Sequence, residues 1–259
     1  MTDGFFPLYV FLLGACIGSF LNVCIYRLPQ EGLSIVSPRS FCPQCRAPVR
    51  GYDNIPLVSY LLLRGKCRNC GAKISWRYPL VEALTGAFAL AFYLKFGLTL
   101  AFFACFAFTA ALVVITFIDL DHRIIPDVIS LPGIAVGFGL SFFLPSPSWI
   151  ESLIGLLAGG GSLYLVAIGY EALTKRDGMG GGDVKLLAMI GAWLGWKAVL
   201  FTLFFASLSG TLIGGGAMLL QKQGRHYAIP FGPFLAFGAL AYLFFGPQLI
   251  HWYLSLGRP

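Results

Sequence analysis

The sequence predicts an all-α polytopic membrane protein with about eight transmembrane helices and a small cytoplasmic, zinc-stapled insert after the first helix. Of its 259 residues, 58% are hydrophobic and only 11% are charged, and the mean hydropathy is +0.80. This composition is too apolar for a water-soluble domain. Most of the chain is occupied by apolar runs close to the roughly 20 residues that cross about 30 Å of hydrocarbon.

Eight such runs follow one another along the chain. Their ranges are 5–26, 79–98, 99–118, 128–145, 150–173, 184–196, 198–220 and 230–254. The sixth run is too short for an upright span, so we expect it to be tilted or re-entrant, or to end nearer Leu203. Asp3 is the only charged side chain before the first run, which is therefore expected to be a retained span and not a cleaved signal peptide.

Lysine and arginine are distributed unevenly between the loops. Fifteen of the 18 fall in four segments that share one side of the membrane if all eight runs cross it. These segments are 27–77, 119–127, 174–185 and 221–229. The positive-inside rule places them in the cytoplasm and both termini in the periplasm. Topology thus explains the net charge of +7, and no nucleic-acid partner is expected.

Glycines cluster in the fifth and seventh apolar runs and predict close packing of these helices, as small residues do in membrane bundles. The clusters are Gly155, Gly159, Gly160 and Gly161 in the fifth run, and Gly210, Gly214, Gly215 and Gly216 in the seventh.

The polar insert at 28–77 contains two CxxC pairs, Cys42 with Cys45 and Cys67 with Cys70, separated by 21 residues. The spacer is slightly longer than the usual range, but two such pairs are a strong signal of a four-thiolate zinc site. Redox pairs and structural disulfides are the alternatives, but a cytoplasmic location disfavours stable disulfides. The insert also has too few apolar residues to form a stable core without a bound metal or a covalent cross-link. Zinc would be structural, because four thiolates leave no coordination position open.

Two aspartates lie at the cytoplasmic edge of apolar runs. Asp119 ends the third run, and Asp183 follows Gly178 and Gly180–Gly182. An acid at the hydrocarbon boundary costs free energy and is a functional candidate. The simpler alternative is a glycine loop followed by an aspartate that caps the next helix. Because the predicted topology puts both acids on one side, we expect them to pair.

The polar neighbours of Asp119 fit a catalytic role less well. Asp121 is about 200° further around a helix, so it faces away from a cleft that contains Asp119. Asp127 follows Pro126 and is expected to begin the fourth helix. His122 is expected to be a solvated side chain at a helix end.

Paired carboxyl groups suggest a reaction. Two acids in one cleft cannot easily both ionise, so one keeps its proton while the other accepts a proton from water. The activated water can then attack a peptide carbonyl. The pair titrates as a unit, and the sequence does not assign the proton to either acid.

These motifs together resemble the type IV prepilin peptidases, the bifunctional leader peptidases and N-methyltransferases of bacterial pilus and type II secretion systems, which are GxGD aspartic proteases. The resemblance covers nearly the whole chain. It is carried by Gly180-Gly181-Gly182-Asp183, by Asp119, by the two CxxC pairs, by Gly18-Ser19-Phe20-Leu21-Asn22-Val23 with Arg27 and Pro29, and by Pro79-Leu80-Val81-Glu82 with Gly86.

The resemblance implies a specific activity. Asp119 and Asp183 would be the catalytic aspartates of an enzyme that cuts prepilins and pseudopilins at the cytoplasmic face of the bacterial inner membrane. The cut would follow the glycine that ends a short basic leader. Gly180, Gly181 and Gly182 are expected to bind substrate, because a glycine backbone lets an extended chain approach Asp183.

The resemblance also implies that the new amino terminus, usually phenylalanine, is methylated with S-adenosylmethionine. The sequence has no glycine-rich nucleotide loop to mark the site. We expect Asn22, Arg27 and Glu82 to contribute, because topology puts them near the zinc-binding insert. A structural pairing of Glu82 with Arg27 or Arg77 is an equally good interpretation.

The predicted organisation has three parts: a first transmembrane helix at 1–27, a zinc-binding, methyltransferase-associated insert at 28–77, and a transmembrane peptidase domain at 78–259. Two other functions are compatible with the sequence. One is a peptidase that does not methylate, and the other is a small-solute or ion transporter that uses the edge carboxylates. The oligomeric state and the choice between pilins and pseudopilins stay open.

Overall fold

The computed structural model describes residues 5–30, 32–37, 39–175, 180–221 and 230–256. Gly178 and the other residues at 176–179 and 222–229, which entered the sequence predictions, lie outside the described residues. Within the described part, the prediction of an all-helical protein is confirmed. The helices are α1 (Phe6–Arg27), the 3-10 helix η1 (Gly51–Asn54), α2 (Val58–Leu62), α3 (Arg77–Phe96), α4 (Leu100–His122), α5 (Asp127–Leu140), α6 (Trp149–Thr174), α7 (Gly181–Leu194), α8 (Trp196–Gln221) and α9 (Gly232–Leu256).

Six of the described helices are long and apolar enough to cross a membrane, namely α1, α3, α4, α6, α8 and α9. Two other helices end earlier than predicted. The fourth run ends as helix at Leu140 and not at 145, because Pro145 disfavours helical conformation in the residue before it. The sixth ends at Leu194 and does not extend towards Leu203, because Gly195, at φ +81°, terminates α7 before α8 begins at Trp196.

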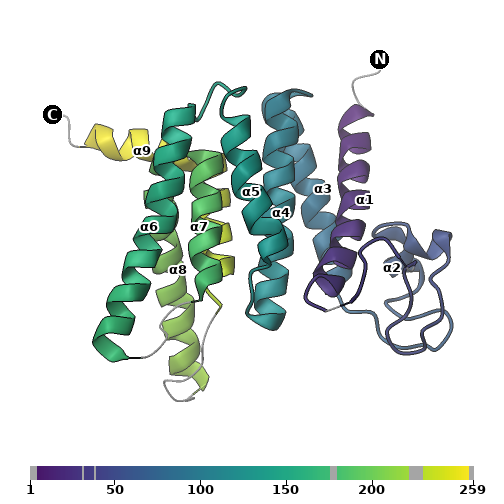
Figure 1. Ribbon diagram of the computed structural model, residues 1–259. Coiled ribbons are helices and arrows are strands. Elements are labelled where there is room, and N and C mark those ends of the chain that lie inside the picture. The colour runs from purple at the N-terminus through teal and green to yellow at the C-terminus, as the bar shows by residue number, and fades with distance from the viewer. Residues whose placement is uncertain (1–4, 31, 38, 176–179, 222–229, 257–259) are drawn as a thin grey trace. The chain divides into compact units, whose positions relative to one another are not determined.

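The chain divides into two compact units, Met1–Val114 and Ile115–Pro259. In the first unit, α1 and α3 form an antiparallel pair (Figure 1). A Cβ added at Gly18 would lie 2.8 Å from the Cα of Glu82, and one at Gly86 would lie 2.9 Å from the backbone oxygen of Phe11. Only glycine fits at these positions, so the two helices are held at a fixed and very short separation.

In the second unit, α6 packs antiparallel against α7. A Cβ at Gly155 would lie 2.3 Å from the oxygen of Gly191, and one at Gly159 would lie 2.4 Å from the oxygen of Leu187. The packing prediction is confirmed for Gly155 and Gly159. It is wrong for Gly161, Gly215 and Gly216, where a Cβ would meet nothing described within 4 Å. Consecutive glycines point in different directions around a helix, so only part of each cluster can face a neighbour.

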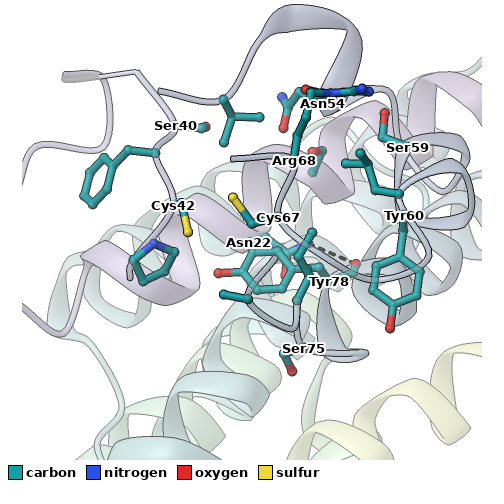
Figure 2. Close-up of a pocket in the computed structure, with 18 of the residues that line it drawn as sticks. Asn22, Ser40, Cys42, Asn54, Ser59, Tyr60, Cys67, Arg68, Ser75 and Tyr78 are labelled. Atoms are coloured by element: carbon teal, nitrogen blue, oxygen red, sulfur yellow. Dashed lines mark hydrogen bonds and ion pairs between the residues drawn. The ribbon is translucent and has the colours of Figure 1, made fainter. Parts of the chain in front are cut away.

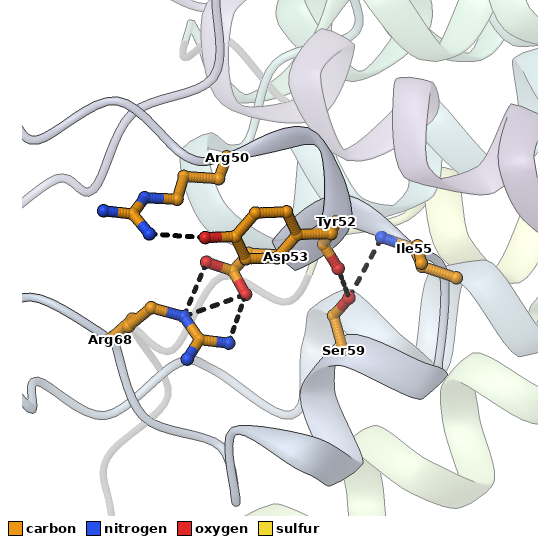
Figure 3. A network of polar contacts seen from close by, with 6 residues as sticks. All are labelled: Arg50, Tyr52, Asp53, Ile55, Ser59 and Arg68. Atoms are coloured by element: carbon orange, nitrogen blue, oxygen red, sulfur yellow. Dashed lines mark hydrogen bonds and ion pairs between the residues drawn. The ribbon is translucent and has the colours of Figure 1, made fainter.

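The insert between α1 and α3 is mostly irregular and is organised by polar contacts (Figure 3). Arg68 donates to both carboxylate oxygens of Asp53, with the shortest contact 2.7 Å from Nη2 to Oδ1. The Oγ of Ser59 donates to the backbone oxygen of Tyr52 and accepts from the backbone N–H of Ile55. These contacts join the 3-10 helix to α2 and to the segment that carries the second CxxC pair.

Candidate aspartate site and cysteine centre

The four cysteines of the insert form one cluster. The Sγ atoms of Cys42, Cys45, Cys67 and Cys70 all lie within 4.8 Å of one another, and those of Cys42 and Cys70 are 3.9 Å apart. Tetrahedral coordination at a Zn–S distance of about 2.3 Å requires sulfurs about 3.8 Å apart. The donor set and its spacing therefore fit a zinc ion.

Each CxxC pair is shaped by the same local backbone pattern. In the first pair, the N–H of Cys42 donates to Ala47 and the N–H of Arg46 donates to Cys42. In the second, the N–H of Cys67 donates to Ala72 and that of Gly71 to Cys67. The residue after the second cysteine of each pair, Arg46 or Gly71, has positive φ, which turns the chain tightly enough to aim both sulfurs inward.

Hydrogen bonds favour the thiolate form of two of the four cysteines, Cys45 and Cys67. The side chain of Asn69 donates to Cys45, and this bond contributes most to lowering the pKa of that thiol to about 6. The backbone N–H groups of Cys70 and Asn69 lower the pKa of Cys67. Zinc binds the thiolate form, so these contacts prepare the cluster for metal.

Asp119 lies buried in the last turn of α4 and reaches the start of α9. Its Oδ2 accepts a hydrogen bond of 3.0 Å from the backbone N–H of Gly232, the first residue of α9. Sequence reasoning missed Gly232, because a glycine between aromatic and proline residues in an apolar run gives no signal of this contact. A Cβ at Gly232 would lie 2.6 Å from the same Oδ2, so the carboxylate occupies the space that a side chain would need.

Asp183 lies in the first turn of α7, with Gly180 as the N-cap. Asp183 is therefore not the capping residue that the simpler alternative required. Asp183 and Asp119 are linked through a common neighbour, Ile125. A Cβ at Gly182, the residue before Asp183, would be 2.9 Å from the Cβ of Ile125, and a Cβ at Gly232, the residue that donates to Asp119, would be 3.4 Å from its Cδ1.

The three predicted substrate glycines have different surroundings. Gly180 and Gly181 are exposed, and a Cβ at Gly181 would meet nothing described within 4 Å. Gly182 instead packs against Ile125. Asp127 begins α5, as predicted, and accepts a hydrogen bond of 2.7 Å from Lys185 at the start of α7.

Asn22, Arg27 and Glu82 line a single cavity of about 750 Å³ in the first unit (Figure 2), together with Cys42 and Cys67. Arg27 donates to the backbone oxygens of Ser34 and Arg39. Glu82 accepts from the N–H of Leu57, which is the N-cap of α2 and has a φ of +62°. These two side chains thus hold insert backbone against the helix pair.

A helical protein with six candidate membrane spans, in which two aspartates are linked through one neighbouring residue, has features expected of a membrane-embedded aspartic peptidase. Residues 12–96 match the model of the bacterial peptidase A24 N-terminal domain, and residues 105–215 match that of the type IV leader peptidase family. The chain belongs to the type IV leader peptidase family. Both aspartates lie within the second match, and the cysteine cluster within the first.

Similar proteins come from several bacteria. The chain is 39% identical to a prepilin leader peptidase/N-methyltransferase from Aeromonas hydrophila, over 95% of this chain and 93% of the relative. It is 38% identical to one from Pseudomonas aeruginosa, over 96% and 94%, and 40% identical to one from Neisseria gonorrhoeae, over 86% and 85%. No solved structure matches the chain.

Proposed function

We propose that this chain removes the leaders of type IV prepilins and secretion pseudopilins at the cytoplasmic face of the bacterial inner membrane. It then methylates the new amino terminus with S-adenosylmethionine. The observation that carries the proposal is that Ile125 is a common neighbour of Gly182, next to Asp183, and of Gly232, which donates to Asp119, and both acids lie within the part of the chain that matches the leader peptidase family. Membership of this family disfavours the transporter alternative.

The contact with Gly232 supports different roles for the two acids. A backbone N–H at a helix N-terminus stabilises the ionised form of a carboxyl group. Asp119 is thus suited to accept a proton from the attacking water. Asp183 then holds the shared proton and donates it to the carbonyl oxygen of the scissile bond. The exposed backbone at Gly180 and Gly181 leaves room for an extended leader beside Asp183.

The proposed division of labour keeps three parts: the first helix at 1–27, the zinc-binding insert at 28–77 and the peptidase domain at 78–259. Cys42, Cys45, Cys67 and Cys70 would hold a structural zinc ion. Bound zinc would fix the shape of the insert, and Asn22, Arg27 and Glu82 would contribute to the site of the methyl donor.

All eight of the longer helices are proposed to cross the bilayer, with both termini in the periplasm. The ion pair of Asp127 with Lys185 joins the starts of α5 and α7. At the other end, the Oγ of Ser152 in α6 donates to the oxygen of Ala192 near the end of α7. Since α6 follows α5 in the chain and starts beside the end of α7, α5 runs in the same direction as α7, away from the end of the second unit that contains Asp183. At about 1.5 Å per residue, α5 and α7 are about 21 Å long, so they cross with local thinning or cover from neighbouring helices.

The test is incubation of the purified full-length protein with a prepilin and isotopically labelled S-adenosylmethionine, followed by mass spectrometry of the product. We expect loss of the leader and one labelled methyl group on the new amino terminus. An uncut prepilin would refute the peptidase. A cut product without label would establish the peptidase that does not methylate.

A further inference from the structure

The cavity in the first unit can serve an activity other than peptide cleavage. Its volume of about 750 Å³ lies within the range of about 300–1,000 Å³ that is usual for small-molecule sites. All of its lining residues fall inside the 12–96 match to the N-terminal domain and outside the 105–215 match to the leader peptidase family. The methyltransferase named in the relatives requires a binding site, and this cavity is available for it.

Asn22 is the residue that indicates a ligand. It is only 4% exposed, and its Nδ2 donates to the backbone oxygens of Gly18 (3.3 Å) and Tyr78 (3.1 Å). Both neighbours are acceptors, so only the NH₂ group can face them and the orientation of the amide is fixed. Its Oδ1 is buried at the cavity wall and has no hydrogen-bond partner among the described residues. Such an atom needs a hydrogen-bond donor in the cavity, which a ligand or a water molecule can supply.

The wall that carries Asn22 is rigid. Gly18, one turn before Asn22, contacts the backbone of Glu82, and this contact leaves no space for a side chain. The second bond of Asn22 goes to Tyr78 in the first turn of α3 (Figure 2). The unpartnered oxygen is therefore held in place before any ligand arrives, which lowers the entropic cost of binding.

The remaining lining suits a zwitterionic nucleoside. Five basic side chains line the cavity against two acidic ones, an excess that attracts a ligand carboxylate. Tyr26, Phe41 and Tyr78 supply aromatic rings against which a purine can pack. S-adenosylmethionine has all three matching groups: a carboxylate, amino groups that donate hydrogen bonds, and an adenine ring.

We propose that S-adenosylmethionine binds in this cavity and that Asn22 Oδ1 accepts a hydrogen bond from one of its amino groups. Arg27 and Glu82 then act as positioning residues that hold the insert over the cavity. This inference rests on the N-methyltransferase activity proposed above. When bound, the donor supplies a methyl group: the lone pair of the deprotonated terminal amine forms the N–C bond, and the electron pair of the broken C–S bond stays on sulfur, which leaves S-adenosylhomocysteine.

The test measures the Kd of S-adenosylmethionine by calorimetry on the full-length protein without any prepilin. Asn22→Leu, a variant of similar size, should raise the Kd ~10-fold or more, because both the ligand and the site lose a hydrogen bond. Val23→Phe, which fills part of the cavity and leaves the bonds of Asn22 intact, should raise it similarly. Thr85→Val is the matched control: it removes a buried hydroxyl from the same helix pair outside the cavity and should leave the Kd unchanged.

Zinc content and prepilin cleavage are measured on the same samples and should match the wild type. Val23→Phe decides the question if Asn22→Leu fails to fold. Unchanged Kd values in folded variants of a wild-type protein that binds the donor would overturn the inference alone. If Asn22→Leu left the Kd of S-adenosylmethionine unchanged but raised the KM for a pre-cleaved peptide, the inference would also be overturned, because Asn22 would then bind the acceptor amine. Failure of the wild type to bind or methylate would overturn the methyltransferase proposal as well.

Discussion

The cysteine centre and the aspartate pair are assembled in different ways. Each CxxC pair is shaped by hydrogen bonds between residues a few positions apart, such as Cys42 with Ala47. The aspartate pair instead depends on α4, α7 and α9, and the bond from Gly232 to Asp119 spans 113 positions. Each CxxC pair is thus shaped locally, whereas the aspartate arrangement exists only when several helices are packed.

The largest effect is expected at the aspartate pair. Asp119→Asn and Asp183→Asn should each reduce prepilin cleavage by ~10²–10⁴-fold, because each removes one member of the acid–base pair. Cleavage is measured by gel and mass spectrometry on protein that is correctly inserted. Both variants should still methylate a pre-cleaved peptide, since the donor cavity lies in the other unit.

Asp121→Asn is the matched control, since Asp121 is two residues from Asp119 but exposed. It should cleave at close to the wild-type rate. Substantial cleavage by Asp119→Asn or Asp183→Asn would refute the catalytic pair. Loss of methylation in these variants, with peptide binding intact, would indicate one shared site for both reactions.

Removal of zinc should affect the insert first. Cys42→Ser or Cys67→Ser should lose most of the bound zinc and increase hydrogen exchange across the insert, because the irregular backbone there would be held by the proposed zinc ion. The exposed cysteine of α1, changed in Cys16→Ser, provides the control and should retain zinc. Metal content is measured by elemental analysis. Unchanged zinc in the Cys42 and Cys67 variants would rule out the four-thiolate site.

A smaller effect on catalysis is expected at Gly232. Gly232→Ala would put a Cβ 2.6 Å from the Oδ2 of Asp119, so the carboxylate must shift. Displacement of a catalytic group by about 1 Å can cost ~10²-fold in rate, and we expect a fall in kcat of ~10–100-fold. Gly215→Ala, where a Cβ meets nothing described within 4 Å, should cleave normally. Equal rates for the two variants would mean that Gly232 does not position Asp119.

The local and long-range arrangements also differ in how far the sequence predicts them. The CxxC spacing predicts the cysteine cluster because the whole signal lies in a few adjacent residues. Topology predicts that Asp119 and Asp183 share a side, but no pattern indicates that Gly232 reaches Asp119. The end of α5 is not predicted for another reason. Apolar residues continue from Phe142 to Leu144, so hydropathy alone does not reveal the helix end, which Pro145 favours.

The smallest effect is expected at Asp127. A change there tests whether this neighbouring acid takes part in catalysis or only stabilises the fold. Its ion pair with Lys185 measures 2.7 Å, but the two side chains are 53% and 38% exposed. Ion pairs this exposed contribute only ~0–1 kcal/mol and weaken with salt. Asp127→Asn should therefore lower the thermal midpoint slightly at low salt, hardly at all at high salt, and leave cleavage unchanged. If cleavage fell as far as in Asp183→Asn, Asp127 would belong to the catalytic site and the buried pair would be incomplete without it.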